Sequence, residues 1–109
     1  MTYRALLLSL TLALAACADF NPGPPPVDVG AFGALIAELQ LAEAAAAEVP
    51  VLVRDSMQAV FFDSVLADHG YSRAEFDSIM WQIRAEPLWI DSVYTRAGEI
   101  VARRLVNEQ

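Results

Sequence analysis

The chain has 109 residues, of which 56% are hydrophobic, and it carries seven Arg, no Lys and fourteen Asp or Glu. Its formal net charge of −7 argues against nucleic acid or an anionic membrane surface as a partner, because both favour basic patches. The length fits one small domain, and the single cysteine, Cys17, excludes an intramolecular disulfide.

Residues 1–16 have the parts of a secretory signal peptide. Arg4 provides the positive n-region, Ala5–Leu14 the apolar h-region, and Ala15 and Ala16 the small residues of a cleavage site. The apolar run is shorter than the about 20 residues that a membrane-spanning helix needs. It is also the only such run that we identify, so no segment is expected to cross a membrane.

The stretch Leu14-Ala15-Ala16-Cys17 has the form of a bacterial lipobox, in which Cys17 becomes the first residue of the mature protein and carries the lipid. Two other interpretations are a buried thiol, the usual state of a free Cys, and a chance Cys within an ordinary signal. The Pro-rich stretch that follows cannot form a core, so the position favours lipidation. Two or more acyl chains anchor a protein stably.

Cleavage leaves 93 residues (109 − 16) with six Arg and fourteen acids, a formal charge of −8. Ala18, where some lipoproteins have Asp, resembles the pattern for release to the outer membrane. Asp19 is one acid and not the acidic cluster of surface-exported lipoproteins. We therefore predict a protein anchored in the cell envelope, at the periplasmic face of the outer membrane.

Residues 17–27 predict a tether to a domain over residues 28–109, because Asn21-Pro22-Gly23-Pro24-Pro25-Pro26 cannot form regular structure. A Pro-rich run extends by about 3.1 Å per residue, so the tether is expected to place the domain roughly 25–30 Å from the lipid. The acidic charge should help to keep that domain off the membrane. A polyproline ligand is the alternative, although only one short run is present.

Four helices are predicted after the tether from apolar residues at helical spacing. The first starts near Asp28, a possible N-cap, and covers about residues 31–48. The second covers residues 51–69, between the helix breaker Pro50 and the helix stop Gly70. Its apolar residues occupy a wide arc, which is typical of a central helix that packs against more than one neighbour.

The third predicted helix covers residues 73–85 and follows the capping box Ser72-Arg73-Ala74-Glu75, which satisfies free backbone amides at a helix start. The fourth covers residues 88–107. No run alternates apolar and polar residues between hairpin turns, so no sheet is expected. The predicted fold class is all-α: a small antiparallel bundle of three long helices and one shorter helix.

Three blocks of sequence carry a resemblance to a known family: residues 35–44, residues 69–78 followed by Glu86-Pro87, and residues 90–94. On these blocks and the lipobox, the chain resembles the uncharacterised bacterial lipoproteins of domain-of-unknown-function family 4296. It departs from them where Met80-Trp81 keeps one of two common aromatics, and where Arg replaces a frequent Lys. The resemblance implies a lipid-anchored helical domain and carries over no catalytic or binding residue.

The polar residues show no catalytic or metal-binding motif. His69 is the only histidine, and the simplest interpretation is a polar residue near a helix C-terminus. A structural zinc site needs about four Cys or His ligands, and the acids of residues 63–77 lack the order of a calcium loop. We therefore expect no metal and no cofactor.

Trp81 is the candidate for partner binding, with Asp77 and Arg84 flanking it. It lies about 140° around the third helix from Phe76, which belongs to the apolar stripe. It is expected either to project as an anchor, since Trp is enriched among binding hot spots, or to fold against the start of the last helix, since large aromatics are mostly buried.

The predicted function is a non-enzymatic interaction module, anchored through Cys17 in membrane lipid, that binds another envelope protein. The lipobox, the spacer, the acidic surface and the absence of a catalytic motif motivate it. The alternative is a periplasmic carrier or chaperone that holds an apolar ligand or peptide between its helices. A third hypothesis is an enzyme that depends on Asp63 or His69, although acid–base catalysis needs positioned groups.

Overall fold

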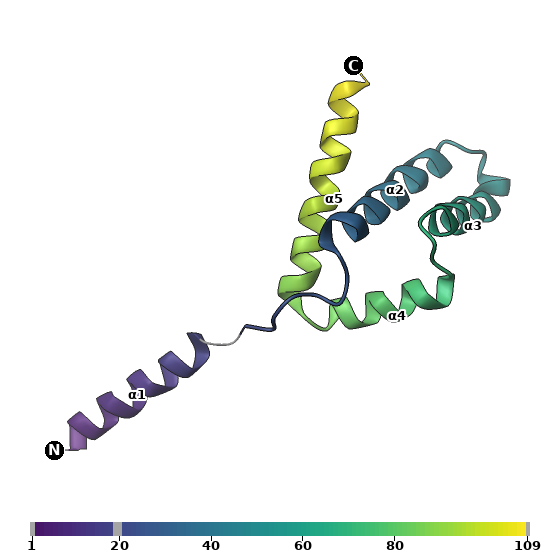
Figure 1. The fold of residues 1–109 in the computed structure, drawn as a ribbon. Coiled ribbons are helices and arrows are strands. Elements are labelled where there is room, and N and C mark those ends of the chain that lie inside the picture. The colour runs from purple at the N-terminus through teal and green to yellow at the C-terminus, as the bar shows by residue number, and fades with distance from the viewer. Residues whose placement is uncertain (1, 19–20, 109) are drawn as a thin grey trace.

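The computed structural model describes residues 2–18 and 21–108, with side chains for residues 2–11 and 21–108. Within these residues the chain forms five helices and no strand (Figure 1). The helices are α1 (Thr2–Ala18), α2 (Val29–Ala47), α3 (Val51–Asp68), α4 (Arg73–Arg84) and α5 (Pro87–Asn107). The all-α class is thus confirmed, and each helix after the tether begins and ends within two residues of its prediction.

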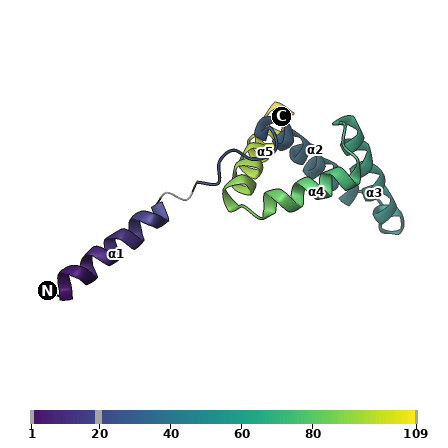
Figure 2. The same cartoon turned by 60° about the horizontal axis from the view of Figure 1, so that its bottom comes forward.

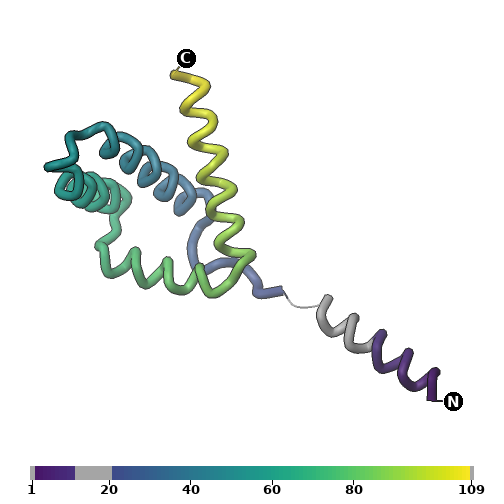
Figure 3. Tube along the Cα trace, turned by 180° about the vertical axis from the view of Figure 1, so that it is seen from behind, coloured from purple at the N-terminus to yellow at the C-terminus, as the bar shows by residue number. Residues whose placement is uncertain are grey.

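The first helix, α1, lies apart from the other four in every view (Figure 1, Figure 2 and Figure 3). It covers the predicted signal peptide, and it makes the whole chain elongated, with principal extents of 73 × 35 × 27 Å. The side chain of Cys17 lies outside the described residues. Signal peptide cleavage and lipid attachment therefore stay predictions.

The central helix of the body is α2, which packs against both α3 and α5. Its buried face includes Phe32, Leu35, Ile36 and Ala37. The prediction that α3 packs against more than one neighbour is confirmed, since it contacts α2 and α4, but α3 is not the central helix, because it contributes only Leu66 to the fully buried side chains of the described chain. The other apolar residues of α3 are half-buried or exposed, since only α2 and α4 pack against it.

The composition of α2 also meets the requirements of a membrane span, with a mean hydropathy of 1.3 over an 18-residue window. We did not identify this run in the sequence as long and apolar enough for a span. However, a core helix of a soluble protein passes the same test, and the apolar face of α2 is used inside the body. Length and composition alone assign no membrane role to α2.

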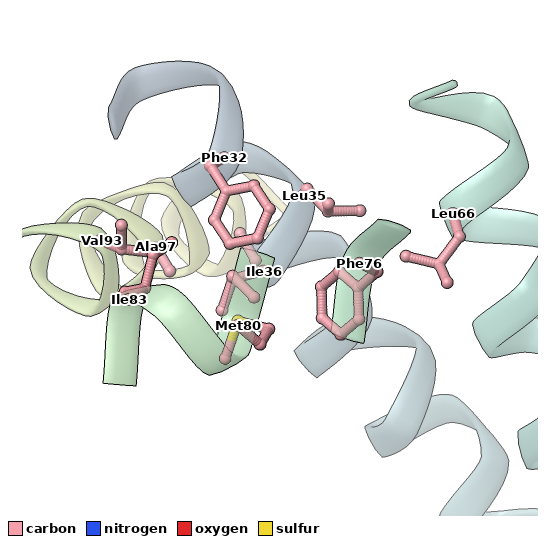
Figure 4. Packing of buried hydrophobic residues seen from close by; sticks show 10 residues of the cluster. Phe32, Leu35, Ile36, Leu66, Phe76, Met80, Ile83, Val93 and Ala97 are labelled. Atoms are coloured by element: carbon pink, nitrogen blue, oxygen red, sulfur yellow. The ribbon is translucent and has the colours of Figure 1, made fainter. Parts of the chain in front are cut away.

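The core combines ten buried side chains from four helices (Figure 4). Phe32 stacks on Phe76 with ring centroids 5.9 Å apart, and Phe62 meets Phe76 edge-on at 5.5 Å. Offset-stacked and edge-on rings are the arrangements that aromatic pairs prefer. The ten core residues are Phe32, Leu35, Ile36, Ala37, Leu66, Phe76, Met80, Ile83, Val93 and Ala97.

Residues close together in the sequence determine the turn between α3 and α4. Gly70 has a φ of +79°, and the amide of Tyr71 donates to the carbonyl of Leu66 at 2.9 Å, so a left-handed glycine ends α3 as predicted. The capping box is also confirmed. The Ser72 hydroxyl accepts from the amide of Glu75 at 3.2 Å, and the Glu75 carboxylate accepts from the amide of Ser72 at 3.4 Å.

Residues 21–28, here called the strap, are held against the body. The indole N–H of Trp89 donates to the carbonyl of Gly23 at 3.1 Å, and Val27 packs against the core. Asp28 is the N-cap of α2, as predicted, and accepts a backbone amide at 2.7 Å. The expected reach of about 25–30 Å therefore does not apply to the whole tether, because the strap is fixed to the start of α5.

The helices α2 and α5 approach closely where both carry small residues. Gly33 and Ala37 on α2 are buried, and so is Ala97 on α5. A Cβ atom on Gly33 would lie 2.7 Å from Cγ and 2.8 Å from Cβ of Arg96, and 3.4 Å from the carbonyl oxygen of Val93. Any side chain at position 33 would thus push the two helices apart.

We predict that Gly33→Ala lowers the free energy of unfolding by about 1–3 kcal/mol, because overpacking at the crossing outweighs the better helix propensity of Ala. Gly98→Ala on α5 is the matched control, since nothing lies within 4 Å of its Cβ position. It should raise the free energy of unfolding by about 0.5–1 kcal/mol. Urea unfolding followed by circular dichroism measures both, and a stabilised Gly33→Ala variant would contradict the close crossing.

Candidate functional site

An open groove of about 500 Å³ lies between α2, α3, α4 and α5. Its lining combines apolar and polar side chains. The apolar ones are Ile36, Leu39, Ala42, Phe61, Phe62, Phe76 and Met80. The ones that carry polar groups are Gln40, Glu43, Gln58, Arg84 and Tyr94. Such a combination can bury an apolar group and orient it through a few hydrogen bonds.

The groove exists because α3 and α5 both pack against α2 but, among the described residues, not against each other. Phe61 and Phe62 on α3 are therefore only half-buried, and Tyr94 on α5 is 43% exposed. In a closed bundle these rings would belong to the core. The apolar excess of α3 was the sequence signal for this surface, and the sequence analysis interpreted it as a central helix.

The predicted partner residue Trp81 is 81% exposed on α4. Of the two alternatives, folding against the start of α5 is wrong, and projection into solvent is confirmed. Asp77 and Arg84 are exposed beside it, as expected. Arg84 also lines the groove, and Trp81 lies about 60° further around the same helix. One continuous surface therefore leads from the groove across Arg84 to Trp81.

His69 meets a carboxylate that its sequence position did not indicate. Its Nε2 atom lies 3.0 Å from Oε2 of Glu38 on α2, and a guanidinium nitrogen of Arg104 on α5 lies 3.5 Å from Oε1 of the same carboxylate. His69 is also the C-cap of α3, in agreement with the predicted polar residue at a helix end. Glu38 thus links three helices at one point.

These polar groups are not brought together with the groove. Neither His69 nor Asp63 is among the residues that line it. Asp63 pairs with Arg73 at 2.8 Å on the surface, and the Arg73 guanidinium lies 4.5 Å from the centre of the Phe62 ring. Within the described residues, no group of three or more His, Cys, Asp or Glu is placed to hold a metal ion. The arrangement of His69 and Asp63 therefore serves helix contacts.

No protein-family model, curated protein or solved structure matches the chain. The resemblance to domain-of-unknown-function family 4296 accordingly stands on the three sequence blocks and the lipobox alone. The groove and the exposed face of α4 are interpreted from their own geometry.

We predict that Glu38→Gln lowers the free energy of unfolding by about 0.5–1 kcal/mol, because a neutral amide loses the ion pair with Arg104 and weakens the hydrogen bond with His69, both of which are partly exposed. Glu43→Gln on the same helix is the control, since no ion pair involves Glu43 in the described part of the chain. Its effect should stay within about 0.5 kcal/mol. Urea unfolding at low salt and at 1 M salt measures both, and equal effects of the two variants would contradict a linking role of Glu38.

Proposed function

We propose that this chain is a lipid-anchored, non-enzymatic interaction module of the bacterial cell envelope that binds an apolar segment of another envelope protein. The observation that carries the proposal is the open groove, whose edge at Arg84 continues to the exposed Trp81. The lipobox at Cys17 supports attachment at the periplasmic face of the outer membrane. The resemblance to domain-of-unknown-function family 4296 supports the same class, and we describe the body as a small, open helical bundle.

The groove suits an apolar segment that carries a few polar groups. Rings such as Phe61 offer apolar surface, while Glu43 and Arg84 can pair with charges at the edge of a bound segment. Protein interfaces have this anatomy, with an apolar centre and a polar rim. An amphipathic helix laid in such a groove presents anchors at i, i+3, i+4 and i+7. Trp81 beside the groove then supplies a second contact of the kind found at hot spots.

We predict that a photo-crosslinking residue in place of Trp81 captures a partner in intact envelopes, and that the added change Phe61→Gln reduces this capture at least several-fold. The reduction follows because one partner is expected to contact both the groove and position 81. Val60→Gln is the matched control, since Val60 is 58% exposed on the same helix and does not line the groove.

Immunoblotting of the crosslinked envelopes gives the measurement. A crosslinked product that forms equally well with Phe61→Gln and Val60→Gln would show that Trp81 binds without the groove. The absence of any product specific to position 81, compared with the exposed position Val106 on α5, would contradict the proposal altogether.

A carrier of a small apolar ligand is the second candidate, because the groove volume falls within the range of about 300–1,000 Å³ found for ligand sites. This function predicts a mass above that of the lipidated mature chain in native mass spectrometry of protein extracted from membranes. The additional mass should be lost in Phe61→Gln and kept in Val60→Gln. Detection of the lipidated mature chain alone would contradict a carrier function.

A further inference from the structure

The strap connects the predicted lipid site to a fixed point on the body. Gly23 has a φ of +77°, and its amide donates to the Asn21 side chain at 3.0 Å. The Trp89 indole N–H donates a hydrogen bond to the Gly23 carbonyl oxygen at 3.1 Å. This bond joins two residues that are 66 positions apart in the chain. Figure 3 shows the strap passing beside the start of α5. Gly23 therefore moves with the body.

The chain between Cys17 and Gly23 is short. It has six peptide units (23 − 17) and spans at most about 20 Å when fully extended, at 3.3–3.6 Å per residue. The helix α5 has 21 residues and is about 31 Å long. If Cys17 carries the lipid, Gly23 stays within about 20 Å of the bilayer in every orientation of the body, and the Trp89 indole at the start of α5 lies next to it. The far end of α5 can lie up to about 31 Å further from the bilayer.

Three apolar residues that adjoin Gly23 and Trp89 in the sequence are exposed. Leu88, the neighbour of Trp89, is 57% exposed, and Pro24 and Pro87 are exposed as well. An apolar side chain held close to a bilayer is stabilised when it leaves water. Pro24 follows Gly23, and Pro87 and Leu88 precede Trp89, so the hydrogen bond between Trp89 and Gly23 holds the two segments together; we call these three exposed residues the corner.

The charge of the chain selects the kind of lipid. The mature chain carries a formal charge of −8, so an anionic surface repels it while a zwitterionic one does not. Near the corner stand one base, Arg84, and two acids, Glu86 and Asp91. The Glu86 carboxylate is already engaged as the N-cap of α5, where it accepts from the amide of Leu88 at 3.4 Å.

We propose that the corner lies on a zwitterionic lipid surface and thereby orients the body on the membrane. This inference depends on the proposed lipid attachment at Cys17. The Pro-rich composition predicted a free spacer. In this proposal the connection from Cys17 is short, and it ends at Gly23, which is bound to Trp89. The first turn of α3, where Leu52 is 97% exposed, lies on the side of the body away from the strap (Figure 1), and it is expected to face water.

Spin labels test the proposal on the full-length protein, processed in cells, purified from membranes and reconstituted in vesicles of phosphatidylethanolamine and phosphatidylcholine. Once Cys17 carries lipid no other thiol remains, so Leu88→Cys and Leu52→Cys each give one labelled site. Oxygen partitions into the bilayer and a nickel chelate stays in water, so their relaxation effects report the surroundings of each label. We expect the label at 88 to be protected from nickel and accessible to oxygen, and the label at 52 to show the reverse.

A second variant examines the link itself. Trp89→Phe removes the indole donor but keeps an aromatic ring, and circular dichroism verifies that the helices remain. The label at 88 should then become accessible to nickel while the protein stays in the vesicles. Equal nickel accessibility at 88 and 52 on protein that carries palmitate would overturn the contact with lipid and leave the groove proposal intact. Failure of palmitate to enter the protein would overturn the anchor and this inference together.

Discussion

The close crossing of α2 and α5 at Gly33 determines how the body is arranged. Because Gly33 has no Cβ, α5 approaches until the stem of Arg96 fills that space, and Val93 and Ala97 become fully buried. The helix α3 packs on another side of α2, so α3 and α5 stay apart within the described chain. The groove is the direct consequence, since α5 does not close over the half-buried ring of Phe61.

Features governed by short-range interactions were predictable from the sequence. The capping box at Ser72, the left-handed Gly70 and the N-cap Asp28 each depend on residues within a few positions of one another. For the same reason the bounds of the four helices after the tether agree with the predictions to within two residues. Helix breakers such as Pro50 determine where a helix begins or ends without any contact to distant parts of the chain.

Features that depend on distant contacts were not predictable. Periodicity shows which face of α3 is apolar, but not that only α2 and α4 are present to cover it. Glu38 and His69 are 31 positions apart and Gly23 and Trp89 are 66 apart, and neither contact leaves a local signal. The sequence left two alternatives for Trp81, because its exposure depends on the direction in which α5 leaves α4. Composition does not determine that direction.

The strap and the groove share one rigid element. Trp89, which holds the strap, and Tyr94, which lines the groove, are five positions apart on α5. A free spacer would only raise the local concentration of the groove near the membrane. With the proposed anchor at Cys17, a strap fixed to α5 would also restrict the direction in which the groove faces, so that a membrane-bound partner would lose less orientational freedom on binding. In the proposed function, the Pro-rich stretch would therefore contribute to recognition through its attachment to Trp89 and not through its length.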